Sequence, residues 1–393
     1  MGVTMSFNPA LLALAAGAFG IGVTEFSPMG LLPVIATDLG VSIPTAGLLV
    51  SAYAVGVVLG APLMTLTTGR VLRKTLLIAL MGIFTAGNLL SAISNSYEML
   101  LFSRLVTSLN HGAFFGVGSV VAASVVPREK RAGAVAAMFM GLTLANVAGV
   151  PLAPWIGEVA GWRAAFWGIA GIGVVAMAAL WLALPKSISA PVGDMSRELG
   201  VLKRPDVLIA LALTVLGSSA MFTVFTYIAP ILQEETGATT GFITAMLVVY
   251  GLGLTAGNWL GGRYADRSID ATLIVTLAAL TGLLLVFAFV MRWPVPAALS
   301  IFAWGVATFA LVPPLQMRVM AAASDAPNLA SAMNIGAFNL GNAIGAALGG
   351  GVIALDLGFP AVSVAGAAMS AAGLALVLLI REAPEPRTSG ARC

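Results

Sequence analysis

The chain has 393 residues, of which 59% are hydrophobic and only 9% are charged, and its formal net charge is +3. Soluble domains contain about 25% charged residues, so this composition excludes a soluble protein and indicates a membrane protein. A single cysteine, Cys393, excludes an internal disulfide, and a single histidine, His111, without cysteine or HExxH partners argues against a zinc site.

Apolar stretches long enough to cross a bilayer recur along the whole chain. Lipid cannot hydrogen-bond to the backbone, so we expect helices, and the stretches are too continuous for the period-two alternation of barrel strands. We therefore predict an all-α polytopic membrane protein with twelve transmembrane helices, at residues 9–36, 45–67, 75–94, 98–124, 133–157, 163–184, 207–232, 241–261, 271–291, 295–317, 328–353 and 359–380.

The longest connection between spans runs from Pro185 to Asp206 and is rich in charged residues. We expect it to be a cytoplasmic linker between two halves of the chain. The predicted domains are an N-terminal six-helix bundle at 1–185, the linker at 186–206, and a C-terminal six-helix bundle with a short cytoplasmic tail at 207–393.

The basic residues predict how the spans are oriented. With the N-terminus placed inside, 16 of the 19 Lys and Arg fall in inner loops. The outer loops receive Arg163 and Arg292, and Arg104 lies within a span. This is a strong positive-inside pattern, so we expect both termini to be cytoplasmic. It also explains the basic pI without a nucleic-acid partner.

The two halves resemble each other at one offset of 197 residues. The chance alternative is similarity among Gly-rich and Leu-rich helices, but the matches follow a span and its basic loop. Duplicated six-helix halves are typical of rocking transporters that bind their solute near the midplane. The matching pairs are Tyr53 and Tyr250, Gly56 and Gly253, Gly60 and Gly257, Leu63 and Leu260, Arg70 and Arg267, Thr75 and Thr272, and Leu76 and Leu273.

The first span contains an acid, Glu25, near its middle. At about 1.5 Å per residue the carboxylate lies roughly 16 Å from either water phase, too far for a Glu side chain to reach. An ionised acid there costs several kcal/mol unless it is paired or hydrated. Glu25 is therefore a candidate functional residue.

Arg104 in the fourth span is the natural partner of Glu25. Burial favours the neutral form of an acid and a nearby cation favours the ionised form, so relative movement of the two groups between states would change proton affinity. The alternative is a permanent ion pair that fixes helix packing. His111 lies on the same face as Arg104, where it can line a cavity, relay protons or bond to a neighbouring helix.

Other embedded polar and aromatic residues are candidates for contact with a solute. Asn334, Phe338 and Asn342 share one face of the eleventh span, which suits a cavity wall or an interhelical ladder. In the fifth span, Gly149 and Pro151 permit close packing and a bend, so they are candidate gating residues or ordinary packing residues. The remaining candidates for solute contact are Phe26, Asn110, Asn146 and Tyr227, each with an alternative role in packing.

Several motifs in the sequence resemble those of a known family. Thr24-Glu25-Phe26 precedes Gly30-Leu31-Leu32-Pro33 and Asp38-Leu39-Gly40, Arg104 precedes His111-Gly112-Ala113-Phe114-Phe115-Gly116, and Asn146 to Leu152 reads NVAGVPL. Over nearly its whole length the chain resembles the major facilitator superfamily, and within it the twelve-span drug:proton antiporters close to bacterial arabinose-efflux-like permeases. The resemblance implies a bacterial inner-membrane location, a proton role for Glu25 and Arg104, and gating by the fifth-span motif.

The chain also departs from this family. Gly69 stands where relatives have an acid before Arg70, although Arg73 remains and the matching C-terminal loop keeps the acid as Asp266-Arg267. These four charged residues are the candidate cytoplasmic latch. Ala153 and Pro154 stand where relatives often have Gly and a small polar residue.

The sequence contains no GxxxxGK[ST] nucleotide loop, so we expect a non-enzymatic, monomeric secondary transporter without cofactors. Its expected partners are protons, a small-molecule substrate and the bilayer. The leading hypothesis is proton-coupled efflux of small organic solutes, drug-like or sugar-like, by alternating access. The alternatives are an uncoupled facilitator or importer of a sugar or nucleoside, and a membrane sensor that has lost transport.

Overall fold

The computed structural model describes residues 8–68, 71–127, 130–185, 203–324 and 327–382. Every regular element in these ranges is a helix. In chain order the longer helices are α1 Pro9–Leu39, α2 Ile43–Thr68, α3 Arg73–Ala92, α4 Tyr97–Ser108, α5 His111–Ser124, α6 Arg131–Leu144, the π-helix η2 Ala145–Gly149, α7 Val150–Ala160, α8 Trp162–Ala183, α10 Pro205–Phe225, α11 Ile228–Thr236, α12 Thr240–Ala265, α13 Ile269–Val290, α14 Pro294–Ala310, α15 Val312–Ala322, α16 Pro327–Ala354 and α17 Phe359–Glu382.

The predicted count of twelve spans is confirmed, since twelve of the described segments are long and apolar enough to cross a membrane. Four spans are interrupted, and the sequence indicated a bend in only one of them, the fifth. The fourth breaks between α4 and α5 at Leu109–Asn110, the seventh between α10 and α11 at Thr226–Tyr227, and the tenth at Leu311. The fifth contains the π-helix η2. Such irregular turns free backbone groups and are frequent at functional positions.

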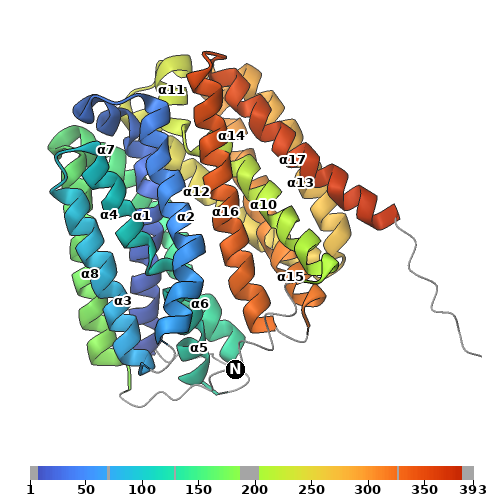
Figure 1. The fold of residues 1–393 in the computed structure, drawn as a ribbon. Helices are drawn as coiled ribbons and strands as arrows, with labels where there is room; N and C mark the ends of the chain where they lie inside the picture. Colours follow the sequence, from blue (N-terminus) through green and yellow to red (C-terminus); the bar gives the residue numbers. More distant parts are fainter. Residues whose placement is uncertain (1–7, 69–70, 128–129, 186–202, 325–326, 383–393) are drawn as a thin grey trace, which may run out of the picture.

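The helices gather into two bundles that stand side by side (Figure 1), with α1 to α8 in one and α10 to α17 in the other. Each bundle has its own apolar core; Phe84, Phe114 and Trp162 are buried in the first, and Phe225, Phe287 and Trp304 in the second. The expected linker lies mainly in residues 186–202, outside the described part of the chain, and α10 already begins at Pro205.

Helix α1 lies against both bundles. Within its own bundle its glycines permit close contact: a Cβ on Gly17 would lie 2.3 Å from the Phe114 ring, and one on Gly22 would lie 2.7 Å from Ala145 Cβ. Farther along, Gly30 faces Leu247 of the other bundle. The helix begins with an Asn8 cap and ends at Gly40, whose φ of 64° suits a residue without a Cβ.

We use "outer end" for the end of the bundles where α1 finishes, following the orientation that the charge pattern predicts. There, Arg163 of α8 forms an ion pair with Asp38 (2.7 Å) and donates to the Ser94 carbonyl (2.8 Å). Trp162 also donates to Asp38. The pair is partly exposed, so its effect on stability is below about 1 kcal/mol. Its geometric effect is to join α1, α8 and the end of α3.

The two bundles are in contact on the outer side of the midplane. Tyr227, at the break between α10 and α11, packs against Gly47 of α2 and donates to the Ala346 carbonyl of α16 (2.8 Å). Ser51 of α2 donates to the Ala343 carbonyl (3.2 Å). These contacts place α2 directly against α16, as Figure 1 shows.

Candidate functional site

Glu25 is buried on α1, with 7% of its surface exposed, between the two bundles. Its Oε2 lies 3.9 Å from Nδ1 of His111, and its Oε1 lies 3.4 Å from Nδ2 of Asn342. In the described part of the chain, His111 is the basic side chain that comes within 4.0 Å of this carboxylate. The acid therefore has no direct Lys or Arg counter-ion in this arrangement.

Arg104 lies beside Glu25 but does not form a direct ion pair with it among the described residues. Its Nη1 donates to Thr24 Oγ1 (3.2 Å), and Thr24 donates in turn to Asn88 Oδ1 (2.6 Å). The guanidinium also lies over the Tyr53 ring, 4.3 Å from its centroid. Two of its nitrogens, Nε and Nη2, have no hydrogen-bond partner in the described structure. Arg104 is therefore a fully buried cation with two N–H donor nitrogens that have no acceptor, near the Glu25 carboxylate.

His111 connects the Tyr53 hydroxyl to the acid. Tyr53 Oη lies 3.1 Å from His111 Nδ1, the same nitrogen that faces Glu25. When a neutral His111 accepts from Tyr53 at Nδ1, its proton is on Nε2 and Nδ1 has none to donate to Glu25. Only a different tautomer or the imidazolium can donate there. In this arrangement the hydrogen bond of Nδ1 is with Tyr53, because the 3.9 Å separation from Glu25 is longer than a hydrogen bond.

The second bundle reaches the acid through Asn342 of α16. Ser218 of α10 donates to Asn342 Oδ1, which orients the amide so that its Nδ2 faces Glu25. Ser218 also lies within bonding distance of the Phe338 carbonyl (2.9 Å). Asn342 belongs to one bundle and Glu25 to the other. The hydrogen bond from Asn342 to Glu25 therefore joins the two bundles at the buried acid.

A cluster of aromatic rings begins at Phe26, the residue after Glu25, and extends into the second bundle. The ring centroid of Phe26 is 5.9 Å from that of Phe222 and 6.1 Å from that of Phe225. Phe225 stacks on Tyr250 at 4.5 Å, and Tyr250 lies 4.7 Å from Trp304. The site thus combines polar groups from both bundles with a cluster of aromatic rings that extends into the second bundle.

The π-helix η2 brings Asn146 against α12. Asn146 Nδ2 donates to the Leu142 carbonyl (3.0 Å), and its own carbonyl faces Gly251. Gly149 packs against α1, where a Cβ would lie 2.3 Å from Val23 Cγ2, and Pro151 is buried at the start of α7. These three residues therefore lie at helix contacts, and their gating or substrate roles stay predictions.

Gly251→Ala is expected to disturb the contact between α12 and η2. Its new Cβ would lie 2.5 Å from the Asn146 carbonyl oxygen, which belongs to backbone and cannot rotate away. Overpacking of this kind costs about 1–3 kcal/mol, so thermal unfolding of the purified protein should begin at a lower temperature. The matched control is Gly262→Ala on the same helix, where no atom lies within 4 Å of the new Cβ. Equal stability of the two variants would contradict close packing of α12 on η2.

The other candidate residues lie away from Glu25 or have partners elsewhere. Asn334 accepts from Thr214 (2.7 Å) and donates to Gln316 (2.6 Å), so it ties helices within the second bundle. Tyr227 packs between the bundles, as described above. Asn110 donates to the Thr107 carbonyl (2.9 Å), while its buried Oδ1 has no partner in the described structure. Phe338 is partly buried against the second core.

The structure describes three of the four candidate latch residues. Arg70 lies outside the described residues, Arg73 is half-buried, and Asp266 and Arg267 are exposed. At this end of the second bundle, one described ion pair joins Arg318 of α15 to Asp270 of α13, and another joins Arg204 to Asp206 at the start of α10. A latching role for the four sequence-predicted residues stays a prediction.

Sequence reasoning missed Tyr53, Ser218, Thr24 and Asn88 as parts of the site. The sequence indicated Tyr53 only as a member of the internal repeat. It indicated Thr24 only as the residue before Glu25 in a motif. Nothing in the sequence pairs Ser218 with the acid. Among the described residues there is no group of three or more His, Cys, Asp or Glu placed to hold a metal ion.

Two bundles of membrane-spanning helices that meet at a buried polar site define a membrane transport protein. The family model of the Major Facilitator Superfamily matches residues 14–336 and 211–392. The chain belongs to this superfamily and is a transporter rather than an enzyme.

Full-length relatives support the same assignment. The chain is 59% identical to the inner membrane transport protein YdhP of Escherichia coli K12, over 98% of both chains. It is 34% identical to a chloramphenicol resistance protein of Streptomyces lividans, over 85% of this chain and 86% of that one. It is 33% identical to a probable sugar efflux transporter of Helicobacter pylori P12, over 90% of both chains.

The fold is also that of a solved transporter. The crystal structure of a D-xylose-proton symporter aligns with a TM-score of 0.76 at 16% identity, covering 95% of this chain and 97% of that one. Together with the twelve spans, the relatives identify a multi-pass protein of the bacterial inner membrane.

Proposed function

We propose that this transporter exports a small organic solute in exchange for protons, with Glu25 as the proton-binding group. The observation that supports this proposal most strongly is the position of Glu25: it is buried, lacks a direct Lys or Arg counter-ion among the described residues, and is contacted from both bundles. A buried acid in a membrane span is costly to keep, and a proton provides a way to remove its charge.

The contact with Asn342 offers a route from protonation to movement. An ionised carboxylate accepts a hydrogen bond roughly twice as strongly as a neutral acceptor. Proton uptake by Glu25 therefore weakens its bond to the Asn342 amide and loosens one link between the bundles. A ligand shifts a conformational equilibrium only by interacting more strongly with one state than with the other. The proton and the solute can therefore act in opposite directions on the hydrogen bond between Glu25 and Asn342.

The chemistry of the site favours an uncharged or cationic amphiphile as solute. One acid, the Asn342 amide and the aromatic residues around Phe26 together suit a molecule with both polar and apolar surface. The printed names of two relatives, a chloramphenicol resistance protein and a probable sugar efflux transporter, agree with drug-like or sugar-like solutes.

The experiment is a solute panel in proteoliposomes that contain the purified protein and an imposed pH gradient. Chloramphenicol, arabinose and lactose are suitable first members. The proposal predicts gradient-driven accumulation of at least one solute that disappears when a protonophore collapses the gradient. An uncoupled facilitator or importer would instead exchange labelled solute at the same rate with and without the gradient, and a sensor would move none.

Asn342→Ala tests the link between the bundles. Without the amide, the charge state of Glu25 has less influence on how the bundles meet, so gradient-driven transport should fall more than counterflow without a gradient. The matched control is Asn339→Ala on the same helix, because Asn339 bonds only to the Ile335 carbonyl in the described structure. Equal losses of gradient-driven transport and of counterflow in Asn342→Ala would argue against this link.

A further inference from the structure

A cavity lies at the outer end, away from the buried acid. Its volume is about 670 Å³, within the range of about 300–1,000 Å³ that accommodates drug-sized ligands. Both bundles form its walls: one side consists of the end of α1 and the start of α2, and the other of α11 and the first residue of α17. The lining residues used below are Pro33, Thr37, Ile43, Pro230, Glu234 and Phe359.

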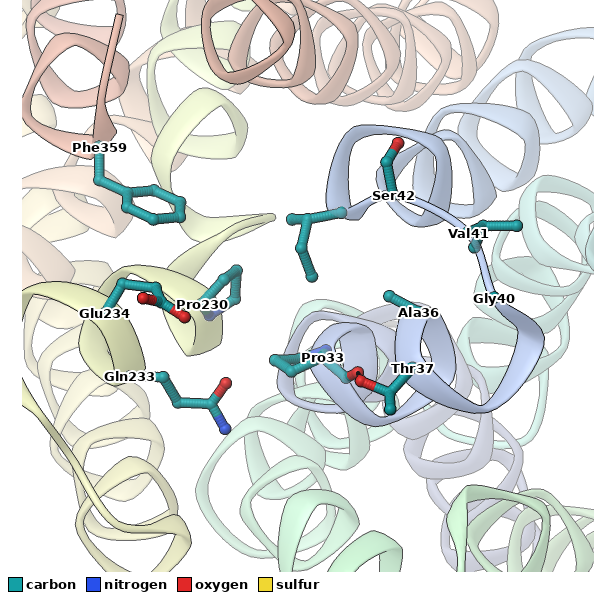
Figure 2. Close-up of a pocket in the computed structure, with 11 residues that line it drawn as sticks. Pro33, Ala36, Thr37, Gly40, Val41, Ser42, Pro230, Gln233, Glu234 and Phe359 are labelled. Carbon is teal, nitrogen blue, oxygen red and sulfur yellow. Dashed lines mark hydrogen bonds between the residues drawn. The ribbon is translucent and has the colours of Figure 1, made fainter. Parts of the chain in front are cut away.

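Figure 2 shows how these side chains face the cavity. Phe359 and Pro230 approach from the second bundle, opposite Pro33 and Thr37 of α1, while the side chains of Gln233 and Glu234 extend toward the same space. The Thr37 hydroxyl already donates to the Pro33 carbonyl (2.9 Å). The cavity therefore combines an apolar wall with one carboxylate.

The charge of the cavity comes from Glu234. Of the acids near it, Asp38 is neutralised by Arg163 (2.7 Å), and Glu235 is paired with Arg292 (3.2 Å). In the described part of the chain Glu234 has no ion-pair partner within 4.0 Å, and no Lys or Arg lines the cavity. A lone carboxylate beside proline and phenyl surfaces matches a ligand that is apolar and positively charged.

We propose that this cavity is a binding site for amphiphilic organic cations at the outer face of the transporter. The apolar part of the ligand lies against Phe359, Pro230 and Pro33, and its positive charge lies near Glu234. A bound cation contacts both bundles, because Glu234 belongs to one and Pro33 to the other. The site is separate in space from the proposed proton-binding acid: Pro33 is eight residues from Glu25 along α1, about 12 Å away.

The test measures equilibrium binding of tetraphenylphosphonium to the purified protein in nanodiscs, with empty nanodiscs subtracted. The proposal predicts saturable binding that weakens about three- to fivefold in Glu234→Gln, as expected for a partly screened charge pair. Binding should also weaken at high salt. Phe359→Ala should weaken it through the loss of apolar contact.

Two variants are controls. Glu235→Gln removes the adjacent acid, which faces Arg292 rather than the cavity, and should leave tetraphenylphosphonium binding within about twofold of wild type. In the Glu25→Gln background, which alters the other proposed solute site, Glu234→Gln should still weaken tetraphenylphosphonium binding about three- to fivefold. The proposal is overturned if Glu234→Gln binds as tightly as wild type, if Glu25→Gln abolishes binding instead, or if the protein binds no more than empty nanodiscs.

Discussion

Glu25→Gln is expected to reduce gradient-driven export to the level of protein-free liposomes. Gln is nearly the same size as protonated Glu but cannot ionise, so the variant resembles one protonation state permanently. The Asn342 amide can still face the side-chain oxygen, and the variant should therefore fold normally. Counterflow of labelled solute without a gradient should continue, because it requires no net proton movement.

The matched control for this variant is Glu158→Gln. Glu158 is an exposed acid on α7 with no ion pair in the described structure, and its substitution should leave gradient-driven export unchanged. Export by Glu25→Gln at the wild-type rate would show that protons enter the cycle elsewhere. Loss of both export and counterflow would indicate a structural role for the acid.

Arg104→Gln is expected to have the second large effect, on stability. Arg104 is fully buried, donates to Thr24 and stacks over Tyr53. The substitution removes the charged hydrogen bond to Thr24, a kind of bond worth about 1.5–3 kcal/mol. It also removes the cation–π contact with Tyr53 and the positive charge near the buried Glu25. We therefore expect a large fall in the melting temperature of the purified protein in detergent.

A double variant separates the effect of the lost charge on stability from the effect of the lost packing. Glu25→Gln combined with Arg104→Gln leaves no uncompensated charge, so its melting temperature should exceed that of Arg104→Gln alone although proton coupling stays absent. Arg292→Gln, which removes an exposed cation, should change stability by less than about 0.5 kcal/mol. A double variant whose destabilisation equals the sum of the two single effects would show that the two charges do not interact.

The spans could be predicted from sequence because hydropathy and loop charge depend on local composition. Glu25 could be singled out because its burial is costly wherever the neighbouring helices lie. The partner of each group could not be predicted in the same way. Arg104 was expected to reach Glu25 directly or through water, and its described hydrogen bond is to Thr24. Such a detail depends on the rotation of one helix against another, which hydropathy does not encode. The contact between Glu25 and Asn342 joins residues 317 positions apart.

The internal repeat predicts two similar halves, but the site itself is asymmetric. The positions 197 residues after Glu25, Arg104 and His111 are occupied by Phe222, Ile301 and Thr308. Charged and titratable groups in the first bundle thus correspond to apolar or hydroxyl groups in the second. The buried charged and titratable groups of the site therefore come from the first bundle, whereas Phe222 and Phe225 of the second bundle pack against Phe26.

Solute-induced proton release tests the central claim most directly. Purified wild-type protein in weakly buffered detergent solution is mixed with the solute that the proteoliposome panel identifies, and the pH of the solution is recorded. Because solute and proton act in opposite directions on the link between Glu25 and Asn342, we predict that wild type releases protons on binding and that Glu25→Gln binds the solute without release. Proton release by Glu25→Gln equal to that of wild type would contradict this account.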